Sequence, residues 1–167
     1  MVKMIKKEIN NYSIFVFGNK IELTSYLTEY ISNKIKNSLK VNDRFKFCVC
    51  GGSTPKVIYE KLSNVDLSWQ DVDIFLGDER CVDPNSEESN SYMIKKSLLI
   101  NFASKSYFYN IFENEVINEK IAKESFINKL KEKCLGFPPV FDLTLLGLGD
   151  DGHTASLFPY NKQNNNN

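Results

Sequence analysis

Blocks of apolar and polar residues alternate along this chain in two different rhythms. Continuous apolar runs, typical of buried strands, occur at residues 13–17, 45–50, 72–76, 107–112 and 141–146. Between these runs, apolar residues recur mostly at every third or fourth position, which predicts amphipathic helices. We expect helices over residues 20–39, from the loop after residue 50 to about residue 62, over 87–100 and over 117–134.

Strand and helix therefore alternate about five times, and the strands are apolar throughout. Both features predict an α/β fold with a doubly wound, mostly parallel, Rossmann-like sheet. We expect this domain over residues 13–160. Residues 1–12 are polar and are expected to be loosely ordered, and residues 161–167 form an asparagine-rich tail.

Composition and charge narrow the choice of partners. The 21 basic and 21 acidic side chains cancel, so the overall field favours neither nucleic acid nor an anionic membrane. No apolar run approaches the roughly 18 residues of a membrane helix, and the N-terminus lacks the apolar core of a signal peptide. We therefore expect a cytoplasmic protein with reduced thiols.

The metal-binding residue types are few. Cys48, Cys50, Cys81 and Cys134 form no CxxC pair, and His153 is the single histidine. A zinc site built from this set would be unusual. Cys50 is interpreted as a small buried apolar residue rather than as a nucleophile.

Glycine-containing polar loops follow three of the predicted strands. Ligands of doubly wound sheets bind at the carboxyl ends of the strands, so these loops can share one crevice. The first loop contains Gly51, Gly52, Ser53 and Thr54. Its glycines allow a ligand to approach the backbone, and N–H groups at a helix start favour phosphate. Ser53 or Thr54 is expected to cap the next helix, and a capped turn without a ligand is the alternative interpretation.

The second loop places Asp78, Glu79 and Arg80 directly after the apolar run 72–76. Only two of the 21 basic residues are arginines, Arg44 and Arg80. A guanidinium grips phosphate or a polarised carbonyl with a geometry that lysine does not share. We therefore interpret Arg80 as a functional residue, with a surface ion cluster as the alternative.

The third loop carries Asp151 and His153 on either side of one glycine. Histidine is the usual general base near neutral pH, and a carboxylate at this spacing can orient its ring. Asp151 and His153 are therefore interpreted as a catalytic pair. A histidine that simply begins a helix is the alternative.

Three segments carry a resemblance to a known family: CGGSTPKVIYEKL, WQDVDIFLGDERCVDPNSEESNSYM and FDLTLLGLGDDGHTASLFP. In their order and spacing they resemble the signature regions of 6-phosphogluconolactonases. The resemblance covers about residues 14–159. It implies hydrolysis of 6-phospho-D-glucono-1,5-lactone to 6-phosphogluconate, in the oxidative pentose phosphate pathway, without a metal or organic cofactor.

The resemblance also implies a role for each matching residue. His153 would activate water, Asp151 would orient His153, and Arg80 would stabilise charge on the lactone oxygen or hold the substrate. The residues that match the substrate- and phosphate-binding positions are Gly51, Gly52, Ser53, Thr54 and Asp78.

Members of the family continue for about another third of the domain after the third segment. We therefore expect this sequence to lack the family's C-terminal third. Some members are fused to glucose-6-phosphate dehydrogenase, so this dehydrogenase is the expected fusion or association partner.

Two other functions compete with the lactonase. Glucosamine-6-phosphate deaminase/isomerases resemble this chain but typically have tyrosine in place of Arg80 and GHIAFNEP in place of GHTASLFP. Phosphosugar-binding regulators carry a helix-turn-helix, for which residues 1–12 are too short. Release of ammonia from glucosamine 6-phosphate would favour the deaminase, and binding of 6-phosphogluconate without hydrolysis would favour a non-catalytic phosphosugar-binding domain.

Overall fold

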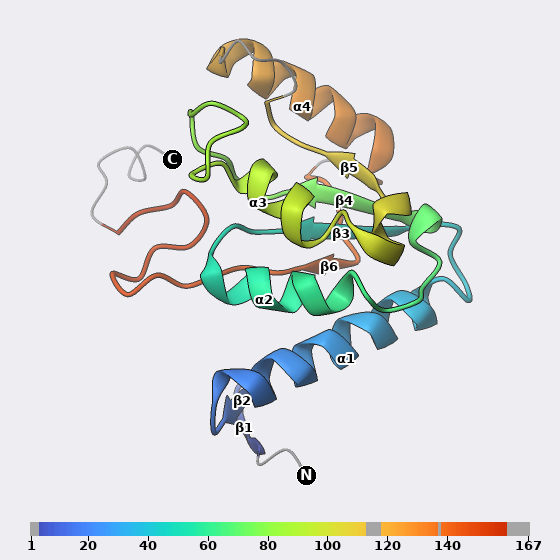
Figure 1. Cartoon of the computed structure of the whole chain (residues 1–167), viewed down its shortest axis with the longest axis vertical. Helices are drawn as coiled ribbons and strands as arrows, with labels where there is room; N and C mark the ends of the chain where they lie inside the picture. The colour runs from blue at the N-terminus through green and yellow to red at the C-terminus, as the bar shows by residue number, and fades with distance from the viewer. Residues whose placement is uncertain (1–3, 113–117, 137, 160–167) are drawn as a thin grey trace.

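A four-stranded parallel sheet forms the centre of the molecule (Figure 1). The computed structural model describes residues 4–112, 118–136 and 138–159. The strands are β3 (Phe45–Val49), β4 (Val72–Leu76), β5 (Tyr107–Tyr109) and β6 (Leu143–Thr144). They lie in the order β5-β4-β3-β6, and each neighbouring pair is parallel. The predicted α/β class with a parallel sheet is confirmed.

Helices lie on both faces of this sheet. They are α1 (Lys20–Ser38), α2 (Ser53–Leu62), α3 (Asn90–Ser97) and α4 (Glu119–Lys133). In Figure 1, α2 lies between α1 and α3, and α2 contacts both. The chain moves from β3 to β4 to β5 in one direction, and then α4 leads it back to β6 at the other edge. Since crossovers between parallel strands are right-handed, this reversal places α4 on the face opposite α2 and α3.

Alternate residues of the central strands build the main core. Phe45, Phe47 and Val49 pair with Val72, Ile74 and Leu76 across β3 and β4, and all six are buried. Helices α1, α2 and α3 pack against them with Ile31, Ile35, Ile58, Tyr59, Leu62, Ile94 and Leu98. Each such side chain contributes about 1.5–3 kcal/mol when it leaves water, so this cluster fixes the helices on that face.

The opposite face of the sheet has a smaller aromatic and ionic cluster. The ring of Phe75 is buried between Tyr109 and Phe141, at centroid distances of 4.7 and 5.4 Å. Beside it, the guanidinium of Arg44 donates two hydrogen bonds to the carboxylate of Asp73, at 2.6 and 2.7 Å. One of the two arginines therefore serves the sheet itself.

The N-terminal region differs from the prediction. Residues Met4–Ile9 form β1, which pairs antiparallel with β2 (Tyr12–Phe17) in a separate two-stranded sheet. Every residue of β1 is exposed, so no pattern of buried positions marked it as a strand. Strand β2 was predicted to be buried, but its residues are exposed or half-buried. Residues 1–3 and the predicted tail 161–167 lie outside the described residues.

The hairpin is held by its turn and by α1. Strands β1 and β2 are joined by two residues, and Asn10 adopts the left-handed conformation that such turns require, with a φ of 54°. The rings of Phe15 and Phe17 pack on Tyr26 of α1, at centroid distances of 5.3 and 5.1 Å. The hairpin therefore packs on α1 and adds no strand to the central sheet.

Candidate functional site

The strand order creates a crevice between β3 and β6. The chain runs from β3 to β4 and β5 in one direction and then returns to β6 on the other side of β3, so the strand order reverses between β3 and β6. Such a switch point is the usual ligand site of open α/β sheets. A cavity of about 450 Å³ lies there, within the range of roughly 300–1,000 Å³ that small-molecule sites occupy.

The cavity collects most of the candidate residues. Seven of the eight line it, namely Gly51, Gly52, Ser53, Thr54, Asp78, Arg80 and His153. Asp151 lies behind His153 and contacts it directly. The other lining residues, to which the sequence gave no role in binding, include Leu23 and Leu27 of α1, Asn90 of α3 and Ala155. Helical spacing marked Leu23 and Leu27 as apolar, but it does not tell a ligand-facing residue from a core residue.

The loop after β3 leads directly into α2. Gly52 is the N-cap residue, with a φ of 111°, and no side chain caps the helix. The prediction that Ser53 or Thr54 caps α2 was wrong, because the helix begins at Ser53 itself. Side-chain oxygens do cap α1, α3 and α4. The first turn of α2 therefore presents uncapped N–H groups beside the cavity, which suits an anion.

A buried tyrosine fixes the start of this loop. The hydroxyl of Tyr59 accepts a hydrogen bond from the backbone N–H of Cys50 at 3.1 Å and donates one to its carbonyl at 3.0 Å. Burial raises the pKa of the Cys50 thiol, and it raises the pKa of Cys48 to about 12. Because a nucleophilic cysteine needs its thiolate, both thiols behave as packing groups.

The loop after β4 is tied to the loop after β6. The Oδ2 atom of Asp78 accepts a hydrogen bond from the hydroxyl of Ser156 at 2.8 Å. Nη1 of Arg80 donates to the carbonyl oxygen of Glu88 at 2.7 Å. Asp78 and Arg80 line the cavity, so this loop contributes one carboxylate and one guanidinium to the site.

Asp151 holds the imidazole of His153 in a defined orientation. Its Oδ1 atom lies 2.5 Å from Nδ1 of the ring and 3.1 Å from the backbone N of His153. The backbone N–H of His153, together with its ring, lowers the pKa of Asp151 below its usual value. The carboxylate is therefore ionised at neutral pH, and a neutral ring carries its proton on Nδ1. Nε2 is then the basic atom, as in a histidine that accepts a proton from water.

The backbone of this loop is shaped around the ring. A Cβ atom on Gly149 would overlap Nδ1 of His153, so the site requires a glycine there. The N–H of Gly149 donates to the carbonyl of His153 at 2.8 Å, and Phe158 stacks on the ring at a centroid distance of 4.9 Å. The hydroxyl of Thr154 closes the loop by donating to the carbonyl of Gly147 at 2.9 Å.

Two general properties of the chain bear on its partners. Within the part of the chain that the structure describes, no three or more His, Cys, Asp or Glu side chains are grouped to hold a metal ion. No helix among those residues is both long and apolar enough to cross a membrane. The expected lack of a cofactor stays a prediction.

Fold and cavity together define a doubly wound α/β protein with an uncapped helix start and an oriented histidine at its switch point. The family described as glucosamine-6-phosphate isomerases/6-phosphogluconolactonase matches residues 18–167. The chain belongs to this family.

Individual relatives point to one branch of the family. A 6-phosphogluconolactonase from Nostoc sp. is 31% identical over 151 residues, which cover 89% of this chain and 63% of the relative. A probable 6-phosphogluconolactonase from Dictyostelium discoideum is 36% identical over 160 residues, which cover 93% of this chain and 65% of the relative. This chain therefore spans less than two thirds of the length of these relatives.

Solved structures agree with both the fold and the branch. A putative 6-phosphogluconolactonase from Neisseria gonorrhoeae matches with a TM-score of 0.78 and 28% identity, over 88% of this chain and 62% of the other. A 6-phosphogluconolactonase from Trypanosoma brucei matches with a TM-score of 0.71 and 29% identity, over 86% of this chain and 62% of the other. A monomeric glucosamine-6-phosphate deaminase matches at 0.63 with 19% identity, which shows the shared fold.

Proposed function

We propose that this chain is a 6-phosphogluconolactonase, which hydrolyses 6-phospho-D-glucono-1,5-lactone to 6-phosphogluconate. One observation carries the proposal: a single cavity holds both the uncapped N-terminus of α2 and the imidazole that Asp151 orients. The helix start suits the phosphate, and the imidazole suits the activation of water. The names of the relatives point to the same substrate.

The chemistry needs only groups that line this cavity. Nε2 of His153 takes a proton from water as the water oxygen bonds to C1 of the lactone. The carbonyl oxygen becomes an oxyanion, which Arg80 stabilises. When the tetrahedral intermediate collapses, the bond from C1 to the ring oxygen breaks, and the imidazolium returns its proton to that oxygen. A positioned general base contributes about 10²–10⁴-fold to such a reaction.

The phosphate gives orientation rather than chemistry. Bound at Ser53 and Thr54, it would fix the far end of the sugar and hold C1 near the histidine. Binding energy from a remote group lowers the barrier by placing the reacting atoms. Asp78 also lines the cavity, and a carboxylate suits sugar hydroxyl groups.

The direct test is lactone hydrolysis by the purified chain, with spontaneous opening of the lactone subtracted. We expect His153→Ala to abolish turnover while the far-UV circular dichroism and the affinity for 6-phosphogluconate are retained. Asp150→Ala is the matched control, because Asp150 is an exposed residue of the same loop, and we expect it to retain full turnover.

Other results would contradict the proposal in distinct ways. Full turnover in His153→Ala would remove this histidine from catalysis. Hydrolysis no faster than the spontaneous reaction, with 6-phosphogluconate still bound, would make the chain a phosphosugar-binding domain. Ammonia release from glucosamine 6-phosphate would assign it to the deaminase branch.

The remaining expectations concern the setting of the reaction. Glucose-6-phosphate dehydrogenase makes the lactone, so it is the proposed fusion or association partner. Co-purification of the two activities from the native source would support this association. The cytoplasmic location is likewise a proposal, which fractionation of that source tests.

A further inference from the structure

The third charged residue of the loop after β4 does not line the cavity. Glu79 binds the N-terminus of α3, where its two carboxylate oxygens accept hydrogen bonds from the backbone N–H groups of Asn90 and Ser91, both at 2.7 Å. The hydroxyl of Ser89 donates to it at 3.1 Å. Carboxylates are strong partners for such groups, because the helix start carries partial positive charge. This helix start is thus occupied by the protein itself, in contrast to that of α2.

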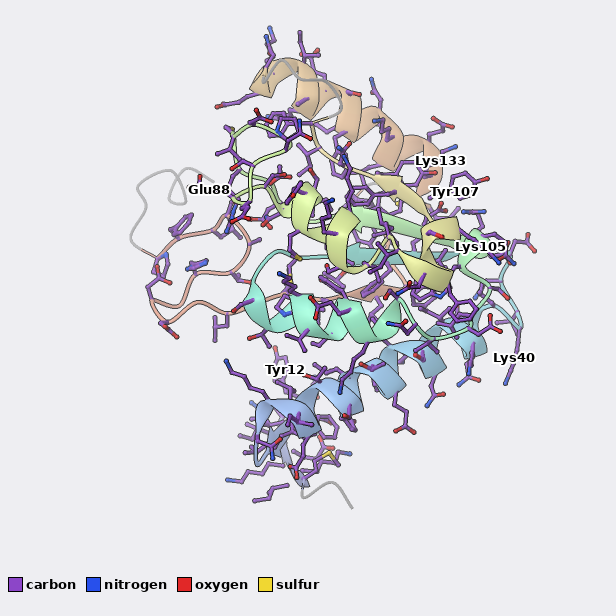
Figure 2. All side chains as sticks on the ribbon, in the orientation of Figure 1. Tyr12, Lys40, Glu88, Lys105, Tyr107 and Lys133 are labelled. Carbon is purple, nitrogen blue, oxygen red and sulfur yellow. The ribbon has the colours of Figure 1, made fainter. Side chains whose placement is uncertain are left out.

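The same carboxylate is connected to Arg80 in two ways. Oε1 of Glu79 accepts the backbone N–H of Arg80 at 2.8 Å. The guanidinium of Arg80 donates to the carbonyl oxygen of Glu88, one residue before the N-cap Ser89. Figure 2 labels Glu88, which lies at the end of the loop between β4 and α3. Both the backbone and the side chain of Arg80 are therefore connected to the start of α3. The backbone is connected through the carboxylate of Glu79, and the side chain through the carbonyl of Glu88.

Asn90, the first residue of α3, also connects the start of this helix to the side of the cavity where the phosphate is proposed to bind. It is buried, and its Nδ2 atom donates to the carbonyl of Asp78 at 3.0 Å. Its Oδ1 atom packs so closely on Gly51 that a Cβ there would overlap it. The start of α3 thus sets the spacing between the loop after β3 and the loop after β4.

We propose that Glu79 is a positioning residue for the hydrolysis: it locks the start of α3 and so holds the guanidinium of Arg80 at the cavity. The inference rests on the proposed function for its kinetic part. Glu79 does not line the cavity, so its effect on the reaction passes through Arg80. Loss of this lock would displace the guanidinium without removing it.

A double-mutant cycle tests this path. We expect Glu79→Ala to lower kcat/KM for the lactone by roughly 10- to 100-fold, since a displacement of about 1 Å costs on that order. In an Arg80→Ala background, the same substitution is expected to cause no further loss. Glu87→Ala is the control, because Glu87 is an exposed residue of the same loop, and we expect it to leave the rate unchanged.

Because the chain has few arginines, Arg80 can also be followed by a measurement that does not depend on lactone hydrolysis. Arg44 and Arg80 are the only arginines, so their side-chain N–H signals in NMR spectra are readily told apart. Glu79→Ala is expected to make the Arg80 side chain mobile and to leave Arg44, bound to Asp73, unchanged. Glu79→Gln, which keeps one acceptor oxygen, provides a milder variant if the alanine variant does not fold.

The outcomes separate the two proposals. Independent losses in the cycle, or an ordered Arg80 in both Glu79 variants, would overturn the positioning role even if the chain hydrolyses the lactone. A chain without lactonase activity whose Arg80 nevertheless loses order in the Glu79 variants would contradict the proposed function and retain the lock.

Discussion

The two arginines show how much a residue's surroundings decide its work. Arg44 is paired with the buried carboxylate of Asp73, and this contact raises the pKa of Arg44. Arg80 donates a hydrogen bond to a backbone carbonyl and lines the cavity. The sequence singled out Arg80 as the functional candidate, but it did not predict the structural role of Arg44, whose partner Asp73 lies 29 positions away.

At Arg80, we expect replacement by lysine to lower kcat/KM by about 10- to 100-fold, because an ammonium cannot hold the Glu88 carbonyl and a developing oxyanion with one planar group. Steady-state kinetics on the lactone measure the loss. Arg44→Lys is the comparison: it should lower the free energy of unfolding by about 1–3 kcal/mol and leave KM unchanged. A full rate in Arg80→Lys would reduce Arg80 to a surface charge.

The local sequence pattern predicted some residues of the site and missed others. Asp151 and His153 were predicted as a pair from their spacing, and the structure places them in hydrogen-bond contact. Asn90 was missed, since an asparagine at a helix start looks like any other polar residue. Its importance comes from Gly51, which lies 39 positions earlier and packs on its side chain.

At the scale of elements, the predictions succeeded where the element packs against the core. The predicted strand over 72–76 matches β4, and the helix over 20–39 matches α1 to within a residue. The strand expected over 141–146 shortens to Leu143–Thr144, because only these residues pair with β3. Strand β1 was missed because it has no buried face. Its pairing with β2 makes it a strand.

The join between β3 and α2 gives a test at this scale. Tyr59→Phe removes the hydroxyl that pairs with both backbone groups of Cys50, and unpaired buried groups cost about 1–3 kcal/mol. We expect urea unfolding to show a loss of that size. Tyr30→Phe on the exposed side of α1 is the control with the same chemical change, and it should be nearly neutral. Equal stability of the two variants would contradict this anchoring role.

At the scale of the whole molecule, the periodicity of the sequence does not predict the order of the strands in the sheet. The alternation of strands and helices predicted a parallel sheet and loops at the carboxyl ends of its strands. It did not show that β6 pairs with β3, and that pairing brings residues 51–54 and residue 153 to one cavity. The sequence could therefore predict the three loops of the site, but not the distances between their side chains.

The buried thiols predict how the whole molecule responds to alkali. The pKa of Cys48 rises from 9.0 to about 12, chiefly through burial. Between these values the unfolded chain loses a proton that the folded chain keeps, so the free energy of unfolding falls as pH rises from about 9 toward 12. The fall is at most about 1.4 kcal/mol per pH unit for this thiol.

Urea unfolding between pH 8 and 11 measures this dependence. We expect Cys48→Ala to flatten the slope, whatever its effect on stability at pH 8. An unchanged slope in the variant would show that Cys48 does not titrate in this way, and that other buried groups such as Tyr59, whose pKa is also raised by burial, set the alkaline limit.

Strand β6 joins the sheet through two residues, and the imidazole is carried on the segment that follows it. Beyond Leu145, that segment is tied back to the loop after β4 by the hydrogen bond from Ser156 to Asp78. Such a segment can detach while the strands behind it stay paired. If the chain hydrolyses the lactone as proposed, hydrolysis would be lost at a lower concentration of denaturant than the fold. The working lifetime of the site would then be set by this short attachment rather than by the strength of the core.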